Sequence, residues 1–196
     1  ITDFTVDETD REIIVTADRP YKFLYYDYNG NFLREKTSEA FYTEITRTTD
    51  NILAINPKVL EPKHYLSLLN EEDHRITVAK KIPLAFTYRG EFRCRGSYLL
   101  KSEHLYFTQN GDYTIYSWDN NRIKPVVTVD FGKYSYNPTQ LNEEPHAPAT
   151  RNKVLSIINV KEIRSNLFFN TNKIGLFVYN KTWHQIVHAY GITNTN

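Results

Sequence analysis

The stretch that decides the fold is Glu12-Ile13-Ile14-Val15-Thr16, then Tyr21-Lys22-Phe23-Leu24-Tyr25-Tyr26-Asp27, then Asn29-Gly30 and Asn31-Phe32-Leu33-Arg34. Asn-Gly between two runs of strand-forming residues is a strong hairpin signal, because a type I′ turn needs positive φ at both central positions. Phe4-Thr5-Val6 precedes the hairpin as a further strand, with a polar turn over residues 7–10. The stretch therefore predicts a unit of four short antiparallel strands.

The same order of strands recurs along the chain: a short strand, an apolar strand, an aromatic strand, a turn and an outer strand. The four copies occupy roughly residues 1–36, 43–81, 97–131 and 157–190. Two inserts, at 83–96 and 133–153, make the period irregular. We expect these inserts to be loops at the faces of the domain, where binding groups usually lie, or else disordered excursions.

Repetition of a four-stranded unit favours one all-β architecture over its competitors. Sandwiches and closed barrels also use many short strands, but they rarely repeat the strand order so regularly. We therefore predict a β-propeller of four-stranded antiparallel blades, with residues 1–196 forming a single propeller domain or part of one. Four blades expose apolar faces unless the ring closes, so we expect this chain to supply about four blades of a six-bladed ring.

Composition excludes several classes of partner. Lys and Arg number 24 and Asp and Glu number 23, so no strong net field attracts nucleic acid. Cys94 is the single cysteine, which excludes an internal disulfide and a cysteine-based zinc cluster. No apolar run is long enough for a membrane span.

A start at Ile1 and the absence of methionine suggest a processed or truncated chain.

One blade resembles a known family. Residues 105–132, and above all Thr114-Ile115-Tyr116 with Asp130-Phe131-Gly132, are similar to a blade of the six-bladed propellers, related to NHL and TolB-like propellers, that are abundant in gut anaerobes. Residues 25–32 resemble a turn of related propellers. The resemblance implies a six-bladed ring, an extracytoplasmic and often lipid-anchored location at the cell surface or in the periplasm, and no established catalytic activity.

Carboxylates offer the most serious candidate chemistry. Propellers of the lactonase kind hold a central calcium ion, and a hard cation needs oxygen ligands that converge from several blades. Four acidic residues are placed near the starts of predicted first or second strands, where side chains can face a channel: Asp3, Glu44, Glu103 and Glu162. The alternative is that these are solvated turn carboxylates. No Gly-x-Ser-x-Gly elbow is present, and the histidines show no spacing suited to a metal ion.

Aromatic residues outside the strand pattern suggest a binding surface instead. Tyrosine rings stack on sugars and are frequent at protein interfaces. Four lie in predicted inter-strand loops and form a candidate binding rim: Tyr42, Tyr88, Tyr134 and Tyr136. The alternative is that they cover the ends of blades.

The sequence thus predicts a non-enzymatic binding or scaffold propeller without a cofactor, which presents face loops to an unknown protein or glycan at the cell surface. The alternative is a calcium-dependent lactonase-like hydrolase with a central metal site. Nucleic acid is not an expected partner.

Overall fold

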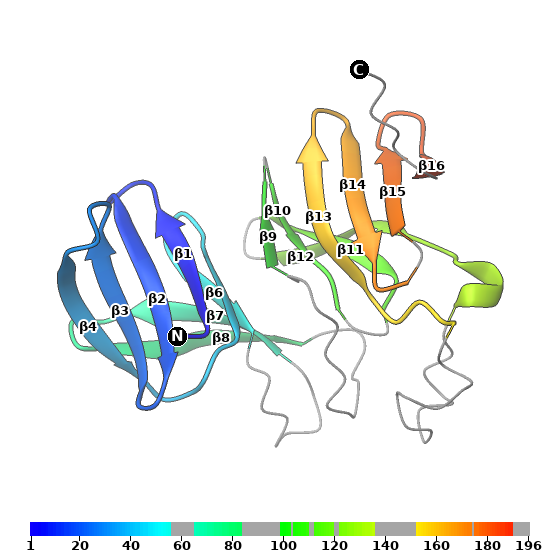
Figure 1. Cartoon of the computed structure of the whole chain (residues 1–196). Coiled ribbons are helices and arrows are strands. Elements are labelled where there is room, and N and C mark those ends of the chain that lie inside the picture. Colours follow the sequence, from blue (N-terminus) through cyan, green and yellow to red (C-terminus); the bar gives the residue numbers. More distant parts are fainter. Residues whose placement is uncertain are drawn as a thin grey trace, which may run out of the picture. The chain divides into compact units, whose positions relative to one another are not determined.

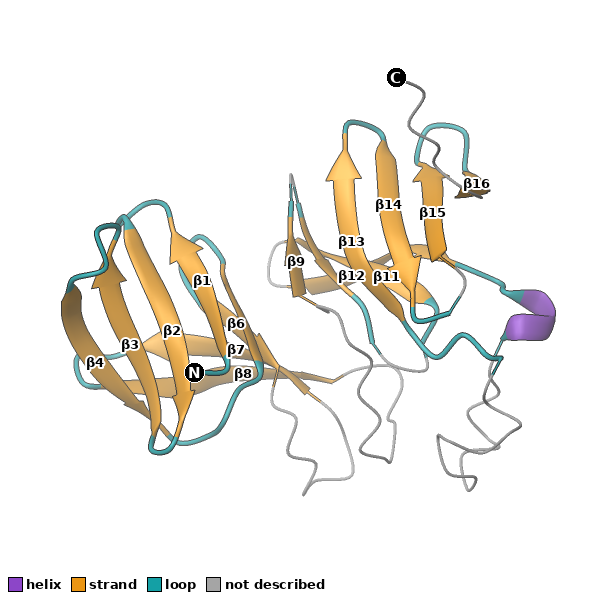
Figure 2. Cartoon of the chain, viewed as in Figure 1, coloured by secondary structure: helices purple, strands orange, loops and turns teal. Residues whose placement is uncertain are grey.

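The computed structural model describes residues 1–55, 65–83, 99–102, 104–109, 112–119, 122–135, 152–173 and 175–189. These residues form strands and turns, with one short 3-10 helix, η1 (Gly132–Tyr134), drawn in purple in Figure 2. No helix among them is long and apolar enough to cross a membrane. The chain divides into two compact units, Ile1–Thr87 and Tyr88–Asn196, and each is described by itself.

The described residues of the first unit form eight strands (Figure 1). Strands β1 (Asp3–Asp7), β2 (Glu12–Asp18), β3 (Tyr21–Asp27) and β4 (Phe32–Ser38) pair antiparallel in chain order. So do β5 (Glu44–Arg47), β6 (Ile52–Ile55), β7 (Tyr65–Glu71) and β8 (Arg75–Pro83). The outer strands β4 and β8 join the two groups through a short parallel pairing of Thr37 with Arg75 and Ser38 with Ile76.

In the second unit, the described residues form two four-stranded antiparallel sheets. One has the order β12-β11-β10-β9 and is formed by β9 (Leu99–Lys101), β10 (Leu105–Phe107), β11 (Thr114–Asp119) and β12 (Arg122–Thr128). The other has the order β13-β14-β15-β16 and is formed by β13 (Ile157–Ile163), β14 (Asn166–Thr171), β15 (Gly175–Asn180) and β16 (Gln185–Ala189). The predicted all-β class and four-stranded antiparallel sheets are confirmed. The predicted single domain over residues 1–196 stays a prediction.

The predicted hairpin after β3 is confirmed, but its turn type is not. Gly30 has a φ of 83°, whereas Asn29 does not have the positive φ that a type I′ turn requires. The Gly30 N–H donates to the Asp27 carbonyl at 3.0 Å, and the Asp27 N–H donates to the Asn31 carbonyl at 3.0 Å. The Asp27 carboxylate also accepts from the N–H groups of Asn29 and Asn31, both at 2.8 Å. These bonds favour a longer loop in which only Gly30 is left-handed.

Apolar side chains alternate along the strands and fill a core in each unit. On β14, for example, Leu167 and Phe169 are buried, while Asn166, Phe168 and Asn170 are partly exposed. In the first unit the core gathers around Ile14, Phe23 and Tyr25. In the second, Phe177 stacks on Phe169 with ring centroids 5.4 Å apart, and Phe131 meets Phe177 edge-on at 5.5 Å. Phe131 belongs to the Asp-Phe-Gly triplet, which therefore anchors a loop to the core.

Side chains of β1 bind the backbone of β5 in the first unit. The Ile45 N–H donates to Asp3 Oδ2 at 2.7 Å, and the Arg47 N–H donates to Thr5 Oγ1 at 3.1 Å. The second unit shows the same kind of contact, since Thr108 Oγ1 donates to the Ile157 carbonyl at 2.9 Å. Short polar side chains thus satisfy backbone groups that no neighbouring strand pairs with.

Candidate functional site

The four tyrosines of the predicted rim have different surroundings. Tyr42 is only 3% exposed and meets Phe23 edge-on, with ring centroids 6.1 Å apart. Burial, with a smaller contribution from Glu39, raises the pKa of Tyr42 to about 12. Tyr134 is 40% exposed. Tyr88 and Tyr136 lie outside the described residues. Among the described members of the set, Tyr134 alone presents its ring to solvent.

Tyr134 stands on a well-braced turn, which we name the Tyr134 platform (residues 130–134 together with Val154). The Gly132 N–H donates to Asp130 Oδ1 at 2.7 Å, and Gly132 takes a φ of 55°. The Tyr134 N–H donates to the Phe131 carbonyl at 3.1 Å, and the Val154 N–H donates to the Tyr134 carbonyl at 2.8 Å. Because Phe131 is buried in the core, the exposed ring is presented by a fixed backbone.

A cation lies over the ring of Tyr134. Lys133 Nζ is 5.1 Å from the ring centroid, which is within the range of a cation–π contact. The Lys133 carbonyl in turn accepts a hydrogen bond from Lys153 Nζ at 2.8 Å. The platform therefore combines an apolar ring face with two ammonium groups, a combination suited to a partner that has both an apolar and an anionic or hydroxyl-bearing part.

The predicted carboxylates are engaged in structural contacts where the structure describes them. Asp3 and Glu44 are the first residues of β1 and β5, as expected, but β13 begins at Ile157, so Glu162 lies near the end of its strand. Burial raises the pKa of Asp3, and its hydrogen bond from the Ile45 N–H opposes this. Glu103 lies outside the described residues. Within the described part of the chain, no group of three or more His, Cys, Asp or Glu residues is placed to hold a metal ion.

Glu162 is the centre of a polar cluster in the second unit. Its side chain is 1% exposed, and three donors converge on it. Tyr106 Oη donates to Oε2 at 2.8 Å, His104 Nδ1 lies 2.6 Å from the same oxygen, and Lys181 Nζ donates to Oε1. Burial alone raises the pKa of a carboxyl, but the bonds from Lys181, His104 and Tyr106 outweigh it, so the pKa of Glu162 lies below its ordinary value.

The backbone of Glu162 is held as well. Ser102 Oγ donates to the Glu162 carbonyl at 2.9 Å and accepts from the Glu162 N–H at 3.1 Å. Ser102 follows β9, and Tyr106 belongs to β10, so the cluster connects one sheet of the unit to the other. Its geometry explains cohesion between sheets and leaves the carboxylate closed to solvent.

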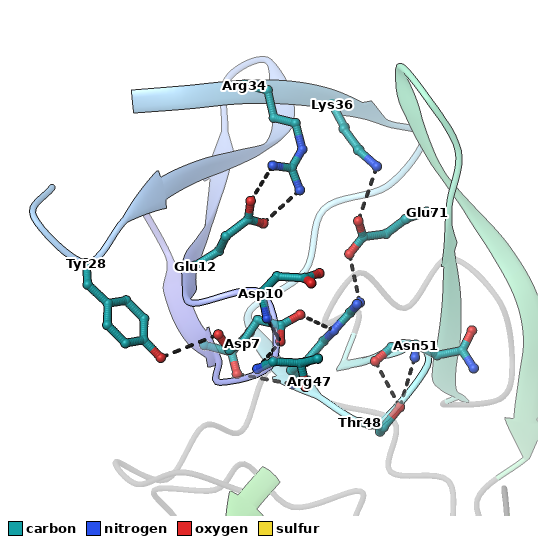
Figure 3. Close-up of polar contacts among 12 residues, drawn as sticks. Asp7, Asp10, Glu12, Tyr28, Arg34, Lys36, Arg47, Thr48, Asn51 and Glu71 are labelled. Atoms are coloured by element: carbon teal, nitrogen blue, oxygen red, sulfur yellow. Dashed lines mark hydrogen bonds and ion pairs between the residues drawn. The ribbon is translucent and has the colours of Figure 1, made fainter. Parts of the chain in front are cut away.

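A second charged cluster connects the strand group β1–β4 to the strand group β5–β8 in the first unit (Figure 3). Arg47 Nε forms an ion pair with Asp7 Oδ2 at 2.7 Å, and Arg47 Nη1 donates to Glu71 Oε1 at 2.8 Å. Glu71 Oε2 accepts from Lys36 Nζ at 3.1 Å. Arg34 binds both carboxylate oxygens of Glu12, at 2.5 and 2.7 Å. The sequence gives no signal for this cluster, because its partners are far apart along the chain.

Tyr25 lies beneath the cations of this cluster. The Arg34 guanidinium is 4.1 Å from its ring centroid and Lys36 Nζ is 5.6 Å from it. Burial raises the pKa of Tyr25 strongly, and the nearby Glu71 carboxylate raises it further. These cations thus contact carboxylates as well as the face of an aromatic ring.

Groups of four antiparallel strands that repeat in order along the chain are typical of the blades of a β-propeller. The chain belongs to the DUF5128 family, described as a 6-bladed beta-propeller, whose model matches residues 1–192. The predicted six-bladed family is therefore confirmed. Among curated proteins, none matches this chain.

Solved structures share this fold at low sequence identity. A Bacteroides fragilis protein that is predicted to be exported is 17% identical, with a TM-score of 0.70 over 94% of this chain and 56% of its own. BamB from Moraxella catarrhalis is 12% identical, with a TM-score of 0.57 over 95% of this chain and 51% of its own. The Pan2 WD40 domain of Neurospora crassa is 16% identical, with a TM-score of 0.53 over 96% of this chain and 53% of its own. The chain thus spans about half the length of these proteins.

Proposed function

We propose that this protein is a binding or scaffold propeller whose Tyr134 platform contacts a protein or glycan partner. The single observation that carries the proposal is an exposed tyrosine ring on a turn that is hydrogen-bonded at each step and anchored by buried Phe131. A fixed aromatic side chain loses little conformational freedom on binding, so its contact area contributes efficiently to affinity.

The state of the described charged groups supports a binding role over catalysis. The Glu162 carboxylate is closed to solvent and already has three donors. Arg47 is paired with Asp7 and Glu71, and Glu71 is also paired with Lys36. A general acid or base has to reach a substrate, and these groups are occupied with each other. Their hydrogen bonds and ion pairs hold strands of each unit together.

An extracytoplasmic location is part of the proposal. It is supported by the resemblance of the fold to a Bacteroides fragilis protein that is predicted to be exported. A lipid anchor and display at the cell surface are the more specific form of this proposal, and fractionation of cells that produce the full gene product tests them directly.

A calcium-dependent hydrolase is the alternative proposal. It is motivated by Asp3 and Glu44 at the starts of β1 and β5. A ligand that binds only the folded state stabilises it increasingly as its free concentration exceeds the dissociation constant, so thermal melting with added calcium separates the two proposals.

The test of the binding role uses a photo-crosslinking amino acid at position 134 and, as a matched control, at position 28. Tyr28 is 44% exposed and belongs to the β3–β4 turn. We expect a defined crosslinked product from position 134 and not from position 28. We also expect a glycan-array or partner-binding signal that is lost in Tyr134→Ala and persists in Tyr28→Ala. Equal labelling at both positions, or binding that Tyr134→Ala leaves unchanged, would overturn the proposal.

A further inference from the structure

One face of the strand group β1–β4 is apolar. Successive residues of a strand point to opposite faces of a sheet, and direct partners on neighbouring strands share a face. Two rows of such partners place seven apolar side chains on one face, which we name the Phe4 face: Phe4, Val15 and Leu24 in one row, and Val6, Ile13, Tyr26 and Phe32 in the other. The first row ends on Glu35 of β4, which forms an ion pair with Lys22. The face is therefore apolar across the group, with charge only at its outer margin.

The two ends of the Phe4 face are open to solvent. Phe4 is 63% exposed and Phe32 is 56% exposed, whereas the residues between them are half-buried or buried. The ring of Tyr26 meets that of Phe32 edge-on, with centroids 5.8 Å apart. An antiparallel sheet that faces water on one side normally carries polar residues there. A contiguous apolar face instead indicates a surface that another part of a protein covers.

The opposite face of the same strands is already covered. Ile14 of β2 and Phe23 of β3 belong to one buried cluster with Ile45 of β5 and Ile52 of β6. The group β5–β8 is thus the neighbour of β1–β4 on that face. Strands β1–β4 are apolar on both faces, which is typical of a sheet that lies between two other layers.

We propose that a further four-stranded sheet of the same six-bladed ring, formed by a part of the gene product outside residues 1–196, covers the Phe4 face. The family fold has six blades, whereas the described residues form four groups of four strands. Blades repeat radially in a propeller, so each blade has a neighbour on both of its faces. The group β5–β8 is one neighbour of β1–β4, and the Phe4 face is the place of the other.

Two other occupants would also bury the Phe4 face. The group β13–β16 would do so by closing a ring of four blades, and a second copy of the chain would do so in a dimer. The first leaves no place for the two remaining blades of a six-bladed ring. The second places the same sheet on both sides of a two-fold contact instead of the next blade of the ring. The proposal uses no residue of the Tyr134 platform, so it stands or fails separately from the binding role.

Hydroxyl-radical labelling of the wild-type full gene product, read by mass spectrometry, tests the proposal. Tyr28 is the matched control, because this aromatic residue is 44% exposed and lies in the β3–β4 turn, outside the two rows of the Phe4 face. In residues 1–196 alone we expect Phe4 to label strongly, as its 63% exposure requires. In the full gene product we expect labelling of Phe4 to fall several-fold and labelling of Tyr28 to stay the same.

A substitution provides a second measurement. Phe4→Asp should lower the melting temperature of the full gene product by about 5 °C or more, because the new carboxylate would be buried without a partner. In residues 1–196 alone the same change lies at an exposed position, and we expect a shift of about 2 °C or less. Tyr28→Asp should have the same effect in both proteins.

Three results would overturn the proposal. The first is strong labelling of Phe4 in the full gene product, and the second is a Phe4→Asp effect that is no larger there than in residues 1–196. The third is protection of Phe4 in residues 1–196 alone. Protection at every concentration would assign the cover to β13–β16, and protection only at high concentration would assign it to a second copy.

Discussion

Replacing Glu162 by glutamine tests how the sheets of the second unit are held together. Glutamine keeps the shape of the side chain and one carbonyl oxygen but removes the negative charge. Three donors converge on the native carboxylate, from Lys181, His104 and Tyr106. The amide NH2 group of glutamine would face at least one of these donors, so at least one charge-assisted bond is lost and one donor is left without its acceptor.

The expected loss in the free energy of unfolding depends on how deeply Glu162 and its donors are buried. A hydrogen bond to a charged group contributes about 1.5–3 kcal/mol, and breaking a fully buried ion pair costs about 3–5 kcal/mol. The Lys181 side chain is 31% exposed and can recover some hydration, so the lower part of this range applies. We expect Glu162→Gln to lower the free energy of unfolding by about 2 kcal/mol, or the melting temperature by about 4–8 °C.

The pH dependence of the free energy of unfolding provides a second test of the role of Glu162. Because the folded-state pKa of Glu162 lies below its ordinary value of 4.5, the stability that the carboxylate contributes is fully present above this pH and is lost as the pH falls through the folded-state pKa. The gap in unfolding free energy between the wild-type chain and Glu162→Gln should therefore be constant near neutral pH and narrow in acid.

Denaturant unfolding followed by tryptophan fluorescence, with circular dichroism as a second probe, measures this gap. Glu35→Gln is the matched control, since Glu35 pairs with Lys22 at an exposed position and its loss should cost less than about 1 kcal/mol. The reasoning is refuted if Glu162→Gln costs no more than Glu35→Gln, or if the gap fails to narrow below pH 4.5.

Three further outcomes follow from the described contacts. Arg47→Met leaves the Asp7 and Glu71 carboxylates without their shared cation. We expect it to lower the free energy of unfolding, measured with denaturant, by about 3 kcal/mol. A loss below about 1 kcal/mol would contradict the role given to this cluster. Asp3→Asn keeps an acceptor for the Ile45 N–H but removes a charge whose pKa is raised by burial, so the melting temperature at neutral pH should rise or stay the same, and a clear fall would argue that the charge itself is needed. For a binding propeller without a calcium site, millimolar calcium should leave the melting temperature unchanged, whereas a rise that EDTA reverses would favour the hydrolase alternative.

Local patterns predicted much of the fold. The alternation of buried and exposed residues on β14, and the hairpin around Gly30, both come from physics that acts within a few residues. The turn type was wrong because the Asp27 side chain bonds to the N–H groups of Asn29 and Asn31 and so favours a longer loop. The turn preference of the Asn-Gly dipeptide does not account for a nearby carboxylate, here that of Asp27, which binds the backbone N–H groups of the loop.

The candidate site could be predicted only in part. Tyr134 falls outside the strand pattern, which marked it as a loop residue, and its ring is exposed. Tyr42 was marked in the same way, yet it packs against Phe23 in the core of the first unit. The difference is tertiary, because whether a loop aromatic faces solvent or covers a core depends on which strands lie beneath it.

The sequence by itself determined the all-β class, the repeated four-stranded unit and the balance of charge, since each depends on the order and kind of residues along a short span. Only the tertiary structure decided what the charged residues do. Arg47 meets Asp7 and Glu71, and Glu162 meets His104 and Lys181, through contacts between strands that are distant in the chain. Such pairs depend on the packing of whole sheets, and no spacing within one chain segment encodes them.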